Sequence, residues 1–202
     1  CTLAGTYDIR EIRRDAAKND GVKVYESNEA RFADPAVDIV VVAVPNDRHK
    51  DLVISALEAG KNVICEKPVE MSVKAFDEMV DASKRTGKFF TVHQNRRWDV
   101  DYLATKEVID SGNIGKPICI ESRIHGSRGI PCDWRCEKAH GGGMILDWGV
   151  HLIDQMLQLH GEKVVKVYCT CSHITNKEVD DGFKLYLTYD DGVTALVEVG
   201  TY

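Results

Sequence analysis

The chain has 202 residues, 44% of them apolar, which is enough to bury one large core or two modest ones. Its formal net charge of -6 and its pI near 5.6 argue against a nucleic-acid-binding surface, because such surfaces carry a clustered basic excess. No segment approaches the roughly 20 consecutive apolar residues of a membrane span, and the N-terminal residues lack the order of a signal peptide. The sequence therefore predicts a cytoplasmic protein with no nucleic-acid and no membrane partner.

The cysteines point the same way. There are seven, an odd number, and Cys65 follows the apolar run NVI, as a reduced cysteine in a strand does. Cys132 and Cys136, with His125 and His140 on either side, could in principle bind a metal ion. Their spacing lacks the paired Cys-x2-Cys of a structural zinc site, so we predict no metal centre.

The first half of the chain alternates between strand-like and helix-like patterns. Apolar, β-branched runs are separated by helical patterns that end at glycines. The strand-like runs are residues 2–9, 22–27, 37–46, 61–68 and 88–94, and the helical patterns are 10–20, 48–60 and 72–87. The run 37–46 is nearly continuous, which predicts a strand buried on both faces of a parallel sheet. Strands joined by helices form βαβ units and a parallel, doubly wound sheet. We predict that residues 1–94 form an α/β dinucleotide-binding domain of the Rossmann type.

The second half has a different pattern. Helical periodicity covers residues 99–112 and 141–160, and strand-like runs cover 115–126, 163–174, 182–191 and 193–202. The last two runs are joined by Asp191-Gly192, which is a strong hairpin signal. We predict that residues 95–202 form an α+β domain with a mainly antiparallel open sheet.

Polar residues follow the predicted parallel strands, where ligands bind in open α/β sheets. Asn46 and His49 follow one strand, Glu66 and Lys67 follow the next, and Asp8 follows the first, where a carboxylate can accept hydrogen bonds from ribose hydroxyls. Each has a plainer interpretation. Asp8 could cap a helix, Asn46 could be a turn residue, and Glu66 with Lys67 could be an exposed ion pair.

The apolar helix 141–160 carries Asp147, His151 and Asp154. Residues four apart share a helix face, so Asp147 and His151 are predicted to lie together. If the substrate is an alcohol, a histidine can remove its hydroxyl proton near neutral pH. A cation such as Lys67 can stabilise the negative charge that develops on the oxygen. From the spacing alone, a structural pair is the commoner explanation, and the role of Asp154 stays open. His160, at the helix end, is predicted to be structural.

Two aromatic residues near these groups have alternative roles. Trp134 and Trp148 could present ring faces to the C–H surfaces of a sugar. Packing in the core explains them at least as well. We leave both interpretations open.

Two stretches together resemble a known family. "VVVAVPNDRHKDLVISALEAGKNVICEKP" and, further along, "GGGMILDWGVHLIDQML" resemble the Gfo/Idh/MocA family of nicotinamide-dependent sugar and polyol oxidoreductases, named for glucose-fructose oxidoreductase, inositol dehydrogenase and rhizopine catabolism. The resemblance implies a cofactor-binding Rossmann domain and a substrate domain whose sheet mediates homo-oligomers. It also implies that Lys67, Asp147 and His151 form the catalytic set for a small sugar or polyol substrate.

The resemblance also implies the cofactor contacts. By this resemblance, Asp8 contacts the adenosine ribose, and Asn46 and His49 lie near the pyrophosphate or the nicotinamide ribose. Glu66 contacts the nicotinamide ribose, with Lys67 beside it. Gln94 or Asn95 lies near the nicotinamide ring. Asp8 favours NAD, since a carboxylate repels a 2'-phosphate, while the nearby Arg10 keeps NADP possible. The Lys67-Pro68 bond is a candidate for the cis form.

One part of the family pattern is absent from this sequence. Members begin with a strand and a G-x-G-x-x-G turn that holds the pyrophosphate. The only comparable glycine sequence here is the GGG at 141–143. We therefore expect the chain to be an internal part of a longer enzyme, incomplete at both ends. Two other functions remain open: an NAD-dependent glycoside hydrolase on the same scaffold, and a non-catalytic sugar- or nucleotide-sensing regulator.

Overall fold

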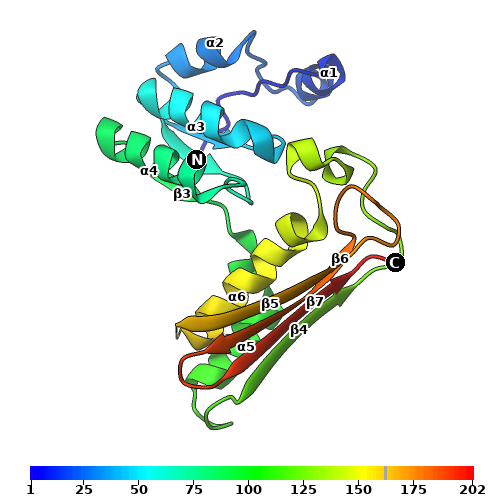
Figure 1. Ribbon diagram of the computed structural model, residues 1–202. Coiled ribbons are helices and arrows are strands. Elements are labelled where there is room, and N and C mark those ends of the chain that lie inside the picture. Colours follow the sequence, from blue (N-terminus) through cyan, green and yellow to red (C-terminus); the bar gives the residue numbers. More distant parts are fainter. Residues whose placement is uncertain (162) are drawn as a thin grey trace. The chain divides into compact units, whose positions relative to one another are not determined.

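The computed structural model describes residues 1–161 and 163–202 (Figure 1). The chain forms two compact units: residues 1–44 with 48–92, and residues 45–47 with 93–202. Each unit has its own apolar core. No helix in the described part of the chain has the length and apolar character that crossing a membrane requires.

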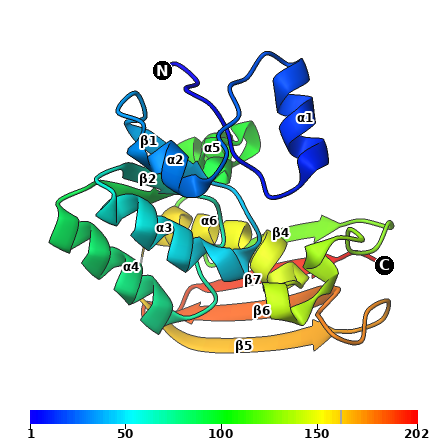
Figure 2. The ribbon, with the colours of Figure 1, turned by 90° about the horizontal axis from the view of Figure 1, so that it is seen from above.

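The first unit is built on a three-stranded parallel sheet, as the sequence predicts. Its strands lie side by side in the order β1 (Ile39–Val42), β2 (Asn62–Cys65), β3 (Phe90–Val92). Parallel neighbours need a crossover, and α3 (His49–Glu58) and α4 (Val73–Thr86) supply it. The two helices pack against each other, and α3 lies on β1 and β2 (Figure 2).

Only one face of β1 is buried among the described residues, so the prediction of a strand buried on both faces is wrong here. The run 37–46 is apolar enough for a strand covered on both faces. In the structure Val40 and Val42 are buried under the helices, whereas Ile39 and Val41 are 47% and 54% exposed. The apolar run therefore indicates a strand here, but it does not indicate that both faces of the strand are covered.

The segments before β1 are less regular than predicted. Strands were expected at residues 2–9 and 22–27, but the structure has a single parallel bridge there, between Thr6 and Val24. An isolated pair of short segments is marginal, because sheets gain stability from further strands. The predicted helix is present as α1 (Glu11–Asn19), and a short helix, α2 (Asn28–Ala33), was not foreseen. Ser27 caps α2 by accepting the Ala30 N–H at 3.1 Å.

The second unit is an α+β fold with a mainly antiparallel sheet, which confirms the prediction. The four strands lie in the order β4-β7-β6-β5, with β4 parallel to β7 and the other two pairs antiparallel. The helices and strands of the unit are α5 (Val100–Asp110), β4 (Cys119–His125), α6 (Val150–His160), β5 (Val164–Ser172), β6 (Gly182–Tyr189) and β7 (Thr194–Gly200).

The sheet of the second unit has one buried face. Along β6 the buried Phe183, Leu185 and Leu187 alternate with the exposed Lys184 and Tyr186. The α5 and α6 helices lie on the buried side (Figure 1). The predicted Asp191-Gly192 hairpin is present, with Gly192 at φ +88°. The sheet thus supports α6, the helix that carries His151 of the predicted catalytic pair.

Candidate functional site

In the first unit, Glu66 and Lys67 directly follow β2 at the carboxyl edge of the sheet. The Glu66 N–H donates to Val42 O at 2.9 Å, which extends the pairing by one residue. Glu66 Oε2 accepts the Lys67 N–H at 3.3 Å, and the Lys67–Pro68 bond is cis, as the sequence suggested. The preceding Cys65 is buried, and burial raises the pKa of its thiol to about 12, in keeping with an apolar role.

The buried His49 ring lies between the segments that follow β1 and β2. Its side chain is 0% exposed, with Nδ1 2.9 Å from Pro68 O and Nε2 3.0 Å from Val44 O. The ring thus bridges the segments that follow β1 and β2. The predicted direct contact of His49 with a cofactor remains a prediction. The observed geometry favours a supporting role, because both ring nitrogens face protein carbonyls.

Asp8 lies just ahead of α1. Its Oδ1 accepts the Arg10 N–H at 2.8 Å, and Arg10 Nε lies 3.5 Å from the same oxygen. This bond closes a local turn, but it does not make Asp8 the helix cap that the plainer interpretation predicts, because Arg10 occupies the N-cap position of α1. Since a third of the Asp8 side chain remains exposed, the bond is compatible with the predicted ribose contact and does not establish it.

Asn46 belongs to the second unit and is held by the loop that leads to α6. Its Nδ2 donates to Gly141 O at 2.8 Å, and the neighbouring Asp47 pairs with His140 Nδ1 at 3.0 Å. Asn46 is 1% exposed, and within residues 1–161 and 163–202 its Oδ1 has no hydrogen-bond partner. The Gln94 Oε1 has the same property. Buried acceptors of this kind fit a ligand that brings hydroxyl or amide donors, as a nicotinamide nucleotide does.

Gln94 and Asn95 mark the start of the turn Asn95–Trp98, directly after β3. Asn95 is exposed, and Gln94 is half-buried. The turn is fixed to α6, because Arg97 makes two short bonds to Asp154, at 2.7 and 2.6 Å. The open question about Asp154 thus has a structural answer: it anchors the turn that follows β3.

Two of the three glycines before α6 allow a close approach of the chain. A Cβ on Gly142 would lie 2.3 Å from Arg135 O, and one on Gly143, at φ +104°, would lie 2.2 Å from Asp180 Oδ1. In return, the Gly143 N–H donates to Arg135 O at 3.0 Å and the Ile145 N–H donates to Asp180 Oδ2 at 2.9 Å. Burial raises the pKa of Asp180, although the hydrogen bond from the Ile145 N–H lowers it. The motif is therefore a packing requirement at the start of the helix.

The predicted continuous helix 141–160 begins differently from an α-helix. Residues Ile145–Gly149 form a π-helical turn, and only then does α6 start. Asp147 lies in that turn and His151 in the first turn of α6, where it is 4% exposed and contacts the edge of Trp148, with ring centroids 6.2 Å apart. The regular α-helix predicted from residue 141 is therefore found only from Val150 onward, and the predicted proximity of Asp147 and His151 stays a prediction. Such π turns are often found at functional sites.

Arg135 lies beside Asp147, and sequence reasoning missed it. Its Nε is 3.4 Å from Asp147 Oδ1. Both residues belong to the second unit, where Arg135 occupies the short turn Trp134–Cys136. In the sequence, this segment offers only possible metal ligands and the aromatic Trp134 as candidates. Its GGG neighbour was the one sequence signal for a close approach.

The remaining polar and aromatic candidates have structural partners. His160 Nε2 lies 3.0 Å from Asp191 Oδ2, which fits the predicted structural role. The Arg96 guanidinium lies 4.2 Å above the Trp148 ring. Trp134 has the Arg135 guanidinium 4.5 Å from its ring centre. Each ring thus has a cation over one face, and that face is not open to a sugar.

No three His, Cys, Asp or Glu side chains among the described residues converge as a metal site would require. All seven cysteines are free thiols. Cys136, one of the considered ligands, donates to Pro131 O at 3.1 Å.

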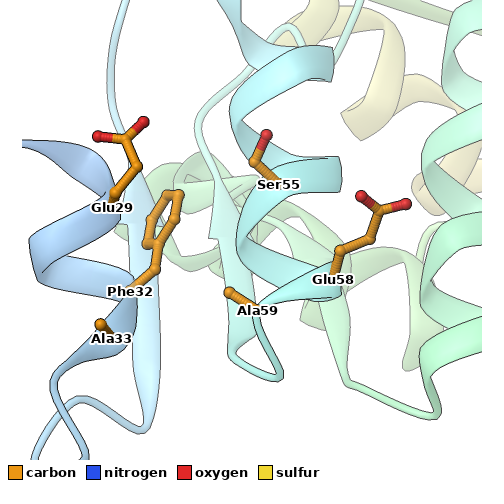
Figure 3. Close-up of a pocket in the computed structure, with 6 residues that line it drawn as sticks. All are labelled: Glu29, Phe32, Ala33, Ser55, Glu58 and Ala59. Atoms are coloured by element: carbon orange, nitrogen blue, oxygen red, sulfur yellow. The ribbon is translucent and has the colours of Figure 1, made fainter.

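Two surface hollows lie away from the predicted residues. One, of about 440 Å³, lies between α2 and α3 in the first unit, with the Phe32 ring and the carboxylates of Glu29 and Glu58 around it (Figure 3). Its α3 residues come from the last turn, from which the chain runs to the start of β2, so this hollow is at the opposite end of the sheet from Glu66 and Lys67. The other, of about 450 Å³, lies between α5 and β4 and is mostly apolar.

Comparison with known proteins decides the family. Residues 2–94 match a family model described as "Oxidoreductase family, NAD-binding Rossmann fold", and residues 102–202 match the GFO/IDH/MocA C-terminal domain. The chain belongs to the Gfo/Idh/MocA oxidoreductase family. This confirms the resemblance seen in the sequence, the fold class and a nicotinamide cofactor for the family.

Individual members of the Gfo/Idh/MocA family are similar over most of the chain. A crystal structure of an NAD-binding protein from Listeria innocua is 53% identical, with a TM-score of 0.96, over 98% of this chain and 58% of that one. A myo-inositol 2-dehydrogenase from Thermotoga maritima is 31% identical over 85% of the chain, and an NADP-dependent scyllo-inositol 2-dehydrogenase from Bacillus subtilis is 30% identical over 91%. The chain spans 51% of the length of each of these two curated relatives.

Proposed function

We propose that the protein oxidises a secondary alcohol of a sugar or polyol, with a nicotinamide dinucleotide as hydride acceptor. The observation that carries the proposal is that Lys67 lies at the carboxyl end of β2, while Asp147 lies in the π turn before α6 and His151 in the first turn of α6, in a member of the Gfo/Idh/MocA family. Two relatives named as inositol dehydrogenases support a polyol substrate.

Each residue has a distinct task in this proposal. The bound dinucleotide supplies the hydride acceptor. His151 removes the hydroxyl proton, Lys67 stabilises the negative charge that develops on the oxygen, and Asp147 holds the substrate. The plainer alternative is that Asp147 and His151 are a structural pair. It is disfavoured because the chain combines them with the lysine of the E-K-P segment in one family pattern.

The proposal also assigns the residues that contact the cofactor. Asp8 and Glu66 would bind the two riboses, and Asn46 and Gln94 bring buried acceptors that suit hydroxyl or amide donors. We propose NAD over NADP, because the Asp8 carboxylate disfavours a 2'-phosphate. The NADP-dependent relative keeps the second cofactor open.

We also propose a homo-oligomer formed through the exposed face of the second-unit sheet. That face carries the rings of Tyr168 and Tyr186, whose centroids are 6.2 Å apart, and a charged group in which Glu198 pairs with Lys184 and Arg123. A change of Tyr186 to Glu should reduce the mass of the full-length protein measured by light scattering. Free thiols are typical of proteins in a reducing compartment, and we propose that this compartment is the cytoplasm.

The test is reduction of NAD by the full-length protein with myo-inositol, scyllo-inositol and a panel of sugars. Steady NADH formation with at least one polyol supports the proposal. Cleavage of aryl glycosides without net NADH would point to the glycoside hydrolase instead. Ligand binding with neither reaction would point to the sensor.

A further inference from the structure

Arg135 makes a pair of charge contacts that nothing in the proposed chemistry uses. Its Nε lies 3.4 Å from Asp147 Oδ1, and its Nη1 donates to Asp133 Oδ2 at 2.7 Å. The side chain of Arg135 is 30% exposed and that of Asp147 only 17%. One guanidinium thus joins a carboxylate of its own turn to the predicted substrate-binding carboxylate.

The backbone of Arg135 meets the same turn of the helix. Arg135 O accepts the Gly143 N–H at 3.0 Å, and Gly143 O accepts the Asp147 N–H at 3.0 Å. Gly142 permits this approach, since a Cβ there would lie 2.3 Å from Arg135 O. Backbone hydrogen bonds through Gly143 thus hold the main chain of Arg135 near that of Asp147. The Arg135 side chain therefore has to span only a short distance to reach the Asp147 carboxylate.

The other contacts of Arg135 limit what it can do. The Asp133 carboxylate also accepts the Arg135 N–H, at 2.9 Å, which fixes the start of the turn. The Trp134 ring lies over the guanidinium at 4.5 Å. Two carboxylates face one cation, so this charge is already balanced by the protein. Such a group orients its neighbour better than it would capture an anionic substrate.

We propose that Arg135 is a positioning residue for Asp147. It fixes the direction of the Asp147 carboxylate, so that Asp147, and not Arg135, contacts the substrate hydroxyls. The inference rests on the proposed function, in which Asp147 holds the substrate. A planar fork with several donors is what this role requires, and lysine would fill it only in part.

A double-mutant cycle in the full-length protein tests the proposal, with myo-inositol and NAD as probes. Arg135→Met should lower kcat/KM by about tenfold, and Arg135→Lys should recover part of the loss. The double variant Arg135→Met/Asp147→Asn should be no slower than Asp147→Asn alone, because Arg135 acts through Asp147. The affinity for NAD, measured by fluorescence, should stay unchanged in Arg135→Met.

Arg128→Met is the matched control. Arg128 is exposed, and among the described residues it has no ion pair; its variant should retain the wild-type rate. If the losses in kcat/KM of the two single variants multiply in the double variant, the role of Arg135 is overturned. A slow Asp147→Asn beside a fully active Arg135→Met would do the same, and in both cases the proposed function would stand. Full activity of Asp147→Asn, or no oxidation of any polyol, would instead remove the proposed function and this inference with it.

Discussion

The two units hold their candidate residues by different means. In the first unit the positions come from the ends of parallel strands and from backbone bonds: the Glu66 N–H bonds to Val42 O, and His49 lies between two carbonyls. In the second unit they come from charged side chains, such as Arg97 with Asp154, and from a glycine approach at Gly142. A strand end places a residue by topology, whereas a loop needs specific partners. Substitutions of partners should therefore matter more in the second unit.

The largest expected effect comes from the predicted catalytic residues of both units. Lys67→Ala and His151→Gln should each lower turnover by about a hundredfold or more while NAD binding persists. Steady-state rates and dinucleotide binding by fluorescence measure both. Lys74→Ala, an exposed lysine on α4, is the control and should be fully active. Wild-type rates in either variant would remove its residue from the catalytic set.

A smaller effect is expected at the glycine approach of the second unit. Gly142→Ala should destabilise that unit by about 1–3 kcal/mol, because the added Cβ meets the backbone at Arg135 O. Gly126→Ala is the matched change, since its Cβ would have nothing within 4 Å. Urea unfolding of the two variants compares them. Equal stability would mean that the loop before α6 moves aside easily, and the contrast between the units would weaken.

The cofactor preference tests the first unit. Asp8→Asn removes a negative charge at the predicted ribose site and should shift the ratio of NADP to NAD affinity by about tenfold toward NADP. Titration of the full-length protein with each dinucleotide gives this ratio. An unchanged ratio would leave Asp8 with its local contacts to the Arg10 N–H and the Arg10 guanidinium.

The smallest effect concerns the hairpin of the second unit. The hydrogen bond from Lys116 lowers the pKa of Asp191, and His160 contributes as well. Because the folded pKa is lowered, this stabilisation is present above the unfolded pKa of about 3.9 and is lost as the pH falls below it. Asp191→Asn should therefore melt below wild type at about pH 5, and the gap should shrink toward pH 2. A gap independent of pH would contradict the assignment.

Much of the fold could be predicted because it depends on local patterns. The alternation of apolar runs and helical periods predicted the parallel sheet, and Asp191-Gly192 predicted the hairpin. The exposed face of β1 could not be predicted, since an apolar run shows only that Ile39 and Val41 suit a strand. The weak bridge between Thr6 and Val24 is a similar case, because pairing depends on which neighbours a segment has.

The site divides in the same way. The residue types and the family resemblance made Lys67, Asp147 and His151 the candidates, and their chemical roles remain predictions. The structure alone supplied their supports. Arg97 bonds to Asp154 across 57 residues of chain, and Asn46 bonds to Gly141 across 95. Periodicity over a window of a dozen residues carries no information about such pairs.

By itself, the sequence determined the family, the two kinds of sheet and the residue types available for dinucleotide and alcohol chemistry. Only the tertiary structure decided that Asp154 is an anchor, that a π turn precedes α6, and that Arg135 lies beside Asp147. The physical reason is that local patterns fix which backbone conformations are favourable. Packing between distant segments then fixes which charged groups meet.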